Sequence, residues 1–292
     1  MDSKAADTSA ESETLARRLA LLVAIPAVVY VDWNMGFTLL NSYSAGAFLI
    51  FMAVPALMAI RQKSQVIGII SRASVPTGVI VASLNTIHLL GSMSDLESSM
   101  SASRLVFAPL ALGVLVSYLL PLADTADPKL VLMLSRKEQF ITMALTLVAS
   151  YVVWFFLFQN QSGFSALIET NSVVISGVVT AICMVYPGNE NLSMQEKAAR
   201  SGLFICVIAA VMGVAFYSFG AAMGPRYMGP AAAAGVLTSL YGSFLVYVAT
   251  MLGGQSSMDA KEARYFDWHL IESWIFLALM MLAPLTLFES FG

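Results

Sequence analysis

An acidic side chain inside an apolar segment is the feature of this sequence best suited to chemistry. Glu272 lies about one helical turn into the segment FDWHLIESWIFLALMMLAP, which begins at Phe266. Ionisable groups at membrane depth are costly and usually mark ion or proton pathways. We therefore expect Glu272 to carry a proton along such a path. The alternative is an interfacial carboxylate that reaches the membrane surface or pairs with Arg264, beside Trp268 and Trp274.

A polar cluster near the end of another apolar segment is the second candidate site. Asn85, Thr86 and His88 lie close together in the segment SVPTGVIVASLNTIHLLG. A histidine can exchange protons at physiological pH, so His88 and Asn85 are candidate residues of an ion path. The alternative is that these side chains form hydrogen bonds between helices, which is the commoner role of polar groups in membrane helices.

Enzyme chemistry is not indicated by the sequence. It contains no Ser-His-Asp order and no HExxH, Walker A, GxSxG or CxxC motif. We expect no enzyme activity, no metal and no cofactor other than a transported proton or sodium ion. The net charge of -3 gives no indication of a nucleic-acid partner.

The composition indicates which elements position these residues. The 292 residues are 58% hydrophobic and 11% charged, whereas a soluble domain carries about 25% charged residues. Long apolar runs account for this hydrophobicity, so we expect an all-α polytopic protein in a lipid bilayer. Nine runs approach membrane-spanning length, at about 19–34, 43–60, 75–92, 105–123, 140–158, 172–187, 202–222, 230–252 and 269–288.

The basic residues predict the orientation of these helices. With the N-terminus inside, thirteen of the fifteen Lys and Arg residues fall in inner segments, and Arg104 and Arg226 fall outside. This asymmetry is the positive-inside pattern and places the C-terminus on the outer side. Residues 1–18 are mostly polar, and we expect them to form a short disordered cytoplasmic tail.

The chain also contains an internal repeat. The segment GFTLLNSYSAGAFLIFMAVPALMAI from Gly36 aligns with GFSALIETNSVVISGVVTAICMVYP from Gly163, at an offset of 127. Three later landmarks share an offset of 129, pairing Gly91, Gly113 and Tyr118 with Gly220, Gly242 and Tyr247. A rival register, which pairs Arg104 with Arg226, has an offset of 122. We expect two parallel four-helix units, over 19–127 and 128–255, followed by a linker and a ninth helix in 256–292.

Small residues crowd the last helix of the second unit, in the stretch GPAAAAGVLTSLYGS. Small faces let membrane helices approach closely. We therefore expect close helix packing at Gly229, Pro230, Gly235 and Gly242.

The same stretch resembles a known family. GPAAAAGVLTSLYG is similar to the start of the fourth transmembrane helix of flagellar stator MotA proteins, G-P-A-x-A-x-A-L-L-T-T-L-Y-G. LPLAD at 120–124 and SALIETNSVVISGVVTAICMVYP at 165–187 resemble that family's L-P-I-A-D exit and second helix. Over about 19–252 the chain resembles a tandem duplication of the MotA/TolQ/ExbB transmembrane unit without the MotA cytoplasmic domain.

The resemblance implies a membrane subunit of an ion-motive-force-driven complex in the bacterial inner membrane. Such a subunit conducts protons or sodium ions together with a single-helix MotB/TolR/ExbD-like partner, and it can also form oligomers. By resemblance, Thr238 and Ser239 match the family's threonine pair and would line the ion path. The ninth helix could replace the partner helix, with Glu272 as its acid.

Two alternatives to a conducting subunit remain open. In the first unit the preferred register places Pro109 and Leu110 at the positions of the threonine pair, so the chain could be a non-conducting scaffold or assembly subunit. The number of helices and His88 would also suit a small-solute carrier with a site between the repeats.

Overall fold

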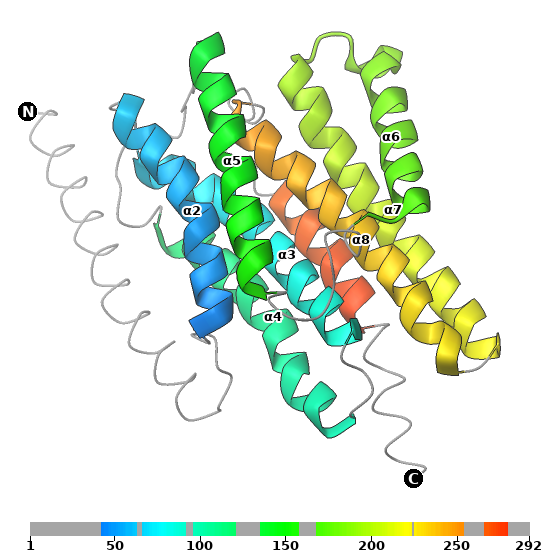
Figure 1. Cartoon of the computed structure of the whole chain (residues 1–292). Helices are drawn as coiled ribbons and strands as arrows, with labels where there is room; N and C mark the ends of the chain where they lie inside the picture. The colour runs from blue at the N-terminus through cyan, green and yellow to red at the C-terminus, as the bar shows by residue number, and fades with distance from the viewer. Residues whose placement is uncertain are drawn as a thin grey trace, which may run out of the picture.

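The computed structural model describes residues 42–62, 66–91, 96–120, 135–157, 168–223, 225–253 and 266–279. These ranges are helical apart from short turns, which confirms the predicted all-α class there. The labelled helices are α2 (Ser42–Gln62), α3 (Val66–Gly91), α4 (Leu96–Leu119), α5 (Arg136–Leu157), α6 (Thr170–Val185), α7 (Met194–Met223) and α8 (Pro225–Met251) (Figure 1). We call the helix over residues 266–279 the central helix. The predicted helix at 19–34 and the tail at 1–18 lie outside the described residues.

Five of these helices are long and apolar enough to cross a bilayer. They contain the candidate spans Ser44–Arg61, Ile67–His88, Arg136–Phe155, Met194–Ala215 and Ala232–Met251. These spans have 18 to 22 residues. At a rise of about 1.5 Å per residue, this length matches a hydrocarbon layer about 30 Å thick. The chain is therefore a helical membrane protein.

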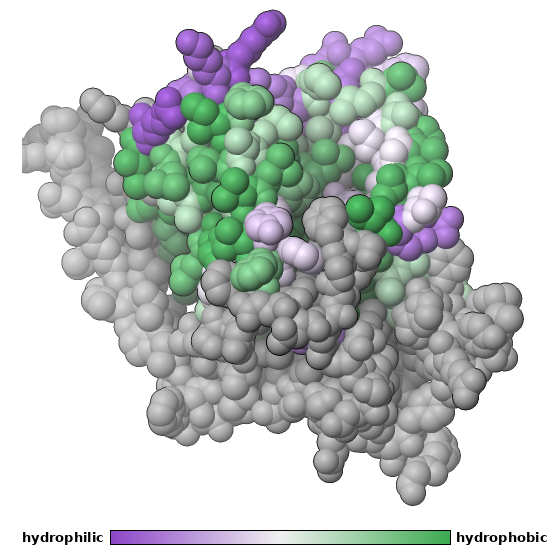
Figure 2. All heavy atoms as spheres, in the orientation of Figure 1, coloured by the Kyte–Doolittle hydropathy of each residue, from purple (hydrophilic) through white to green (hydrophobic). Residues whose placement is uncertain are grey.

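The surface has the polarity expected of such a protein. Figure 2 shows hydrophilic residues gathered along the upper edge of the view, above a mainly hydrophobic flank. At this end α2 turns into α3 and α6 turns into α7 (Figure 1). The exposed residues there include Arg61 at the end of α2 and Glu190 in the turn before α7. Among the residues that the structure describes, this end of the bundle thus carries a group of charged side chains.

Two helices begin at capping boxes that the sequence carries in plain form. The backbone N–H of Ser193 donates to Oε2 of Glu196 at 2.6 Å, and the N–H of Glu196 donates to Oγ of Ser193 at 3.2 Å. Ser135 and Glu138 make the same reciprocal pair at the start of α5. Such boxes satisfy backbone donors that the first helical turn leaves without partners.

Several helices extend into segments that we predicted to be loops. The apolar run was expected to begin at about residue 75, whereas α3 begins at Val66. The intervening residues VIGII are apolar and continue the helix, because nothing between Val66 and Arg72 interrupts the backbone hydrogen bonds. Arg72 was assigned to a cytoplasmic connection, but it lies inside α3 and is partly buried.

In the hairpin of α3 and α4, the backbones of the two helices cross in close contact. A Cβ atom at Gly113 would lie 2.6 Å from the carbonyl oxygen of Ser74 and 3.2 Å from Cα of Gly78. Because both distances are too short for a side chain, only glycine fits at position 113 without a shift of the backbone.

The hairpin of α7 and α8 repeats this crossing. A Cβ atom at Gly242 would lie 2.6 Å from the carbonyl oxygen of Gly202 and 3.0 Å from the backbone nitrogen of Cys206. Gly113 and Gly242 are paired by the repeat, and the neighbours Ser74 and Gly78 correspond to Gly202 and Cys206 in nearly the same register. The same contact therefore occurs at equivalent positions in both hairpins.

The remaining helices pack around these two hairpins. α2 packs against α3 as α6 packs against α7, and α8 packs against α3 between the two halves. α5 packs mainly against α2, so the first helix of the second predicted unit lies on the first unit (Figure 1). The halves are thus joined mainly through α3 with α8 and α2 with α5.

Candidate functional site

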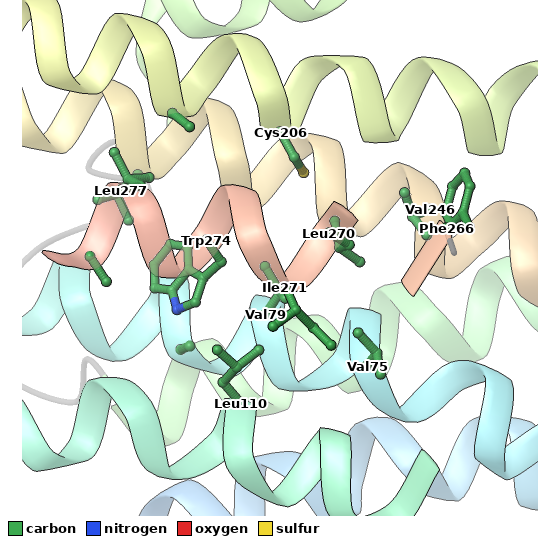
Figure 3. Packing of buried hydrophobic residues seen from close by; sticks show 14 of the residues in the cluster. Val75, Val79, Leu110, Cys206, Val246, Phe266, Leu270, Ile271, Trp274 and Leu277 are labelled. Carbon is green, nitrogen blue, oxygen red and sulfur yellow. The ribbon is translucent and has the colours of Figure 1, made fainter. Parts of the chain in front are cut away.

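The central helix lies between the two hairpins. Its buried side chains form one cluster with residues of α3, α4, α7 and α8. Figure 3 shows α3 on one side of this helix and α7 and α8 on the other. The cluster members from the central helix are Phe266, Leu270, Ile271, Trp274, Leu277 and Ala278.

The largest of these side chains fixes the position of the central helix. Trp274 is fully buried and points toward Leu110 of α4 and Val79 of α3 (Figure 3). On the other side, Leu277 packs into the space above Gly213 of α7, where a Cβ atom would lie 2.3 Å from its Cδ1 atom. An aromatic ring on one face and a glycine contact on the other hold the helix against both halves.

Asp267 is the buried acid of this helix. It shares the buried face with Leu270, Ile271 and Trp274, and its Oδ1 atom has no hydrogen-bond partner among the described residues. Arg72 of α3 interacts with it electrostatically. A buried carboxylate next to a partly buried guanidinium is the arrangement in which a change of charge on one group has a large effect on the other.

Glu272, the acid that the sequence favoured, lies on the opposite face. Its side chain is 52% exposed, and its Oε2 atom lies 3.1 Å from Nδ1 of His269. The two residues are three positions apart and form a surface pair on the outer face of the helix. The described contacts therefore do not place Glu272 between the hairpins.

Thr238 and Ser239 lie in the buried part of α8. The hydroxyl of Thr238 donates to the carbonyl oxygen of Ala234 at 2.8 Å. The backbone oxygen of Ser239 accepts from Oγ of Ser243 at 2.9 Å and from the thiol of Cys206 at 3.6 Å. The Thr238 proton is thus used within its own helix, which leaves its oxygen lone pairs available as acceptors.

Asn85 and His88 lie elsewhere on α3. The Nδ2 group of Asn85 donates to Oγ of Ser44 in α2 at 2.9 Å, and His88 is half-buried. The central helix instead contacts α3 through Val75, Val79 and Ala82. Asn85 therefore joins α3 to α2, and the structure gives no contact that brings it to Thr238 or Asp267 among the described residues.

The glycines of α8 lie at the crossing with α7. A Cβ atom at Gly235 would lie 2.6 Å from Cα of Gly213, and Gly242 makes the contact with Gly202 described above. Gly229 and Pro230 lie in the helical backbone of α8, in a part where side chains fall outside the described residues. Close packing in the structure is thus between α7 and α8.

A titratable group outside the spans caps α6. The Glu169 side chain accepts hydrogen bonds from the backbone N–H of Asn171 at 3.2 Å and of Ser172 at 2.6 Å. Partial burial raises the pKa of Glu169, but the hydrogen bonds from Ser172 and Asn171 outweigh it and leave the pKa below its usual value. Glu169 therefore stays ionised as an N-cap, which suits the positive end of the helix.

Asp267 was not among the candidate residues predicted from the sequence. Helical spacing places it on one face with positions 270, 271, 274 and 278, but because both faces are apolar it does not show which of them is buried. Glu272 belongs to the other face, with Trp268, Ile275 and Leu279. The two faces are distinguished by helical spacing but not by the depth of a residue in the apolar run.

No known protein family matches this chain, and neither a curated protein sequence nor a solved structure does. Its functional interpretation therefore depends on its own residues and contacts. Of these, the buried helix between two equivalent hairpins is the most specific feature.

Proposed function

We propose that the chain is a MotA/TolQ/ExbB-like membrane subunit of an ion-motive-force-driven complex, with its own central helix in the place of a separate partner helix. The observation that carries the proposal is the position of this helix, buried between the α3/α4 and α7/α8 hairpins. In the family that the sequence resembles, such units surround a single helix bearing an acid. The proposal includes nine membrane helices, an inner-membrane location and a cytoplasmic N-terminus.

In this proposal the proton carrier is Asp267 rather than Glu272. Asp267 is buried and interacts electrostatically with Arg72, whereas Glu272 is half-exposed beside His269. The ionised carboxylate attracts Arg72, and uptake of a proton removes that attraction. Each proton cycle would therefore change the force between the central helix and α3. The driving energy is adequate, since one charge crossing 100 mV releases about 2.3 kcal/mol.

The acceptor groups of α8 support the same path. Thr238 is buried, and its hydroxyl proton is held by Ala234, so its oxygen presents lone pairs toward a passing cation or hydronium ion. Ser239 lies next to it at the same depth in the membrane. These residues would lower the cost of an ion in an otherwise apolar region.

Proton flux into liposomes that contain only the purified full chain tests this function. A potassium-diffusion potential drives the flux, and a pH-sensitive dye inside the liposomes reports it. We expect flux for the native chain, loss of flux for Asp267→Asn, and unchanged flux for the matched control Glu272→Gln. A loss for Glu272→Gln with full flux for Asp267→Asn would contradict the assignment of the acid.

A non-conducting scaffold is the second candidate function, and one observation favours it. The residues around the middle of the central helix are apolar, among them Val79, Leu110 and Trp274. A folded native chain without flux, recovered from membranes with a single-helix protein, would support this candidate. Circular dichroism of the reconstituted chain distinguishes it from a chain that has failed to fold.

A further inference from the structure

One face of α2 is covered within the chain, in part by helices of the second half. Ala47 and Phe51 are buried in a cluster that contains Val153 of α5 and Tyr247 of α8. The hydroxyl of Tyr247 donates to the carbonyl oxygen of Phe51 at 2.7 Å. The two rings meet edge to face, with centroids 5.7 Å apart.

The equivalent face of α6 is bare. In the repeat alignment that pairs Gly36 with Gly163, Ala47 and Phe51 correspond to Val174 and Val178. These valines are 57% and 53% exposed. α6 uses its other side to pack on α7 and α8, where Ser172 donates to the carbonyl oxygen of Ala234 at 3.1 Å.

The residue equivalent to Tyr247 is exposed as well. Tyr118, its counterpart in the first half, lies near the end of α4 and is 47% exposed, whereas Tyr247 is fully buried. The chain thus exposes the counterparts of both sides of the Tyr247–Phe51 contact. These counterparts are Tyr118 in the first half of the chain and Val178 in the second. Neither of them makes this contact within the part of the chain that the structure describes.

We propose that a second copy of this chain docks head to tail on the first, with Tyr118 of one copy against Val174 and Val178 of the next. The contact repeats between chains the one that Tyr247 and Phe51 make within a chain. It is heterologous, because different surfaces of the two copies meet. Helix packing and an interhelical hydrogen bond from the Tyr118 hydroxyl to the backbone oxygen of Val178 provide the attraction in lipid. This inference does not depend on the proposed ion transport.

Crosslinking between differently tagged copies tests the docking. In a Cys183→Ala/Cys206→Ala background, one copy carries Tyr118→Cys and the other Val178→Cys, and a short thiol-to-thiol crosslinker is added to native membranes. We expect a product that carries both tags. The matched control pairs Val178→Cys with Phe140→Cys. Phe140 is an exposed residue in the first turns of α5, and the proposed docking does not place it against α6.

The absence of a two-tag product, or an equal yield from the control pair, would overturn the docking and leave lipid as the cover of both faces. Maleimide labelling of each single-cysteine chain shows that the thiols are accessible and the variants folded. Native mass spectrometry of the unmodified chain in nanodiscs gives a second test. We expect dimers or larger assemblies there, and about three-fold weaker association for Tyr118→Phe. A chain that stays monomeric at all concentrations would also overturn the proposal.

Discussion

The two halves of the chain share one crossing and differ in what surrounds it. Gly113 and Gly242 make the same backbone approach in the α3/α4 and α7/α8 hairpins. In the membrane span of α3, however, 78% of the residues are buried, whereas 44% are buried in the span of α7. α3 is covered by α2, α4, α8 and the central helix, whereas α7 exposes Phe204 and Val211.

The difference shows which part of the repeat is constrained by the hairpin itself. At the crossing, a side chain would collide with backbone, so both copies require a small residue. On the flanks, each helix adapts to its neighbour, which is protein for α3 and the outside of the bundle for α7. Equivalent positions on the flanks can therefore carry different residues, such as Phe51 and Val178, without loss of the shared geometry.

Removal of the link between the halves is the substitution with the largest expected effect. Trp274→Ala deletes the largest buried side chain of the central helix, and we expect it to cost about 3–5 kcal/mol of stability. Thermal unfolding in mild detergent measures the effect. The matched control is Trp268→Ala on the half-exposed face, for which we expect a loss below about 1 kcal/mol. Equal losses would show that the central helix does not join the halves.

The shared crossing predicts equal effects in the two halves. Gly113→Ala and Gly242→Ala each place a methyl group against backbone atoms, and we expect each to cost about 1–3 kcal/mol. Gly46→Ala and Gly177→Ala are the controls, because nothing lies within 4 Å of a Cβ atom there. In an open helix this change is expected to stabilise by up to about 1 kcal/mol. A large loss of stability for only one of the two variants would show that the two crossings are not equivalent.

Tyr247 and its counterpart Tyr118 test the difference in packing between the two halves. Tyr247→Phe removes a buried hydrogen bond to Phe51, and we expect it to lower monomer stability by about 1 kcal/mol. Tyr118→Phe at the exposed counterpart is expected to leave the stability of the monomer unchanged. Unfolding in detergent, at concentrations that keep the chain monomeric, gives both values. A comparable loss for Tyr118→Phe would indicate a contact within the chain instead of between chains.

The smallest expected effect concerns pH. The pKa of Glu169 lies below its usual value in the folded chain because of its hydrogen bonds with Ser172 and Asn171. Its contribution to stability is therefore complete above the ordinary carboxyl pKa and is lost as the pH falls through the lower folded-state value. We expect Glu169→Gln to cost about 1 kcal/mol or less at neutral pH and to flatten the loss of stability in acid. Identical acid profiles for the variant and the native chain would contradict this role.

The helices could be predicted from the sequence because each is a local property of the chain. Apolar run length predicted α5 to within a few residues, whereas α7 begins at Met194, eight residues before the predicted run, at a capping box of Ser193 that the prediction did not use. The boundary of α3 was wrong because the polar residue Arg72 was read as the mark of a loop. A long side chain such as arginine is tolerated in a helix when its charge finds a partner, here Asp267.

The arrangement of the candidate site was not predictable in the same way. Whether Asp267 or Glu272 is buried depends on which face of the central helix meets the hairpins, and that is decided by residues far away in sequence. Tyr247 and Phe51 are 196 positions apart, and no local pattern in α2 or α8 indicates that they touch. Depth in an apolar run singled out Glu272 alone, whereas lateral packing buries Asp267 and leaves Glu272 half-exposed.

The position of the central helix has a consequence for biosynthesis. This helix follows both hairpins in the chain, yet it is buried between them. The α3/α4 and α7/α8 hairpins can form as each is inserted, because their crossings need only local partners. α3 and α8 pack directly on each other, but the surface that both hairpins present to residues 266–279 is covered only when those residues enter. The buried centre of these hairpins is therefore completed after its surroundings, and a chain truncated before Phe266 would keep both hairpins but lack the helix that packs against them.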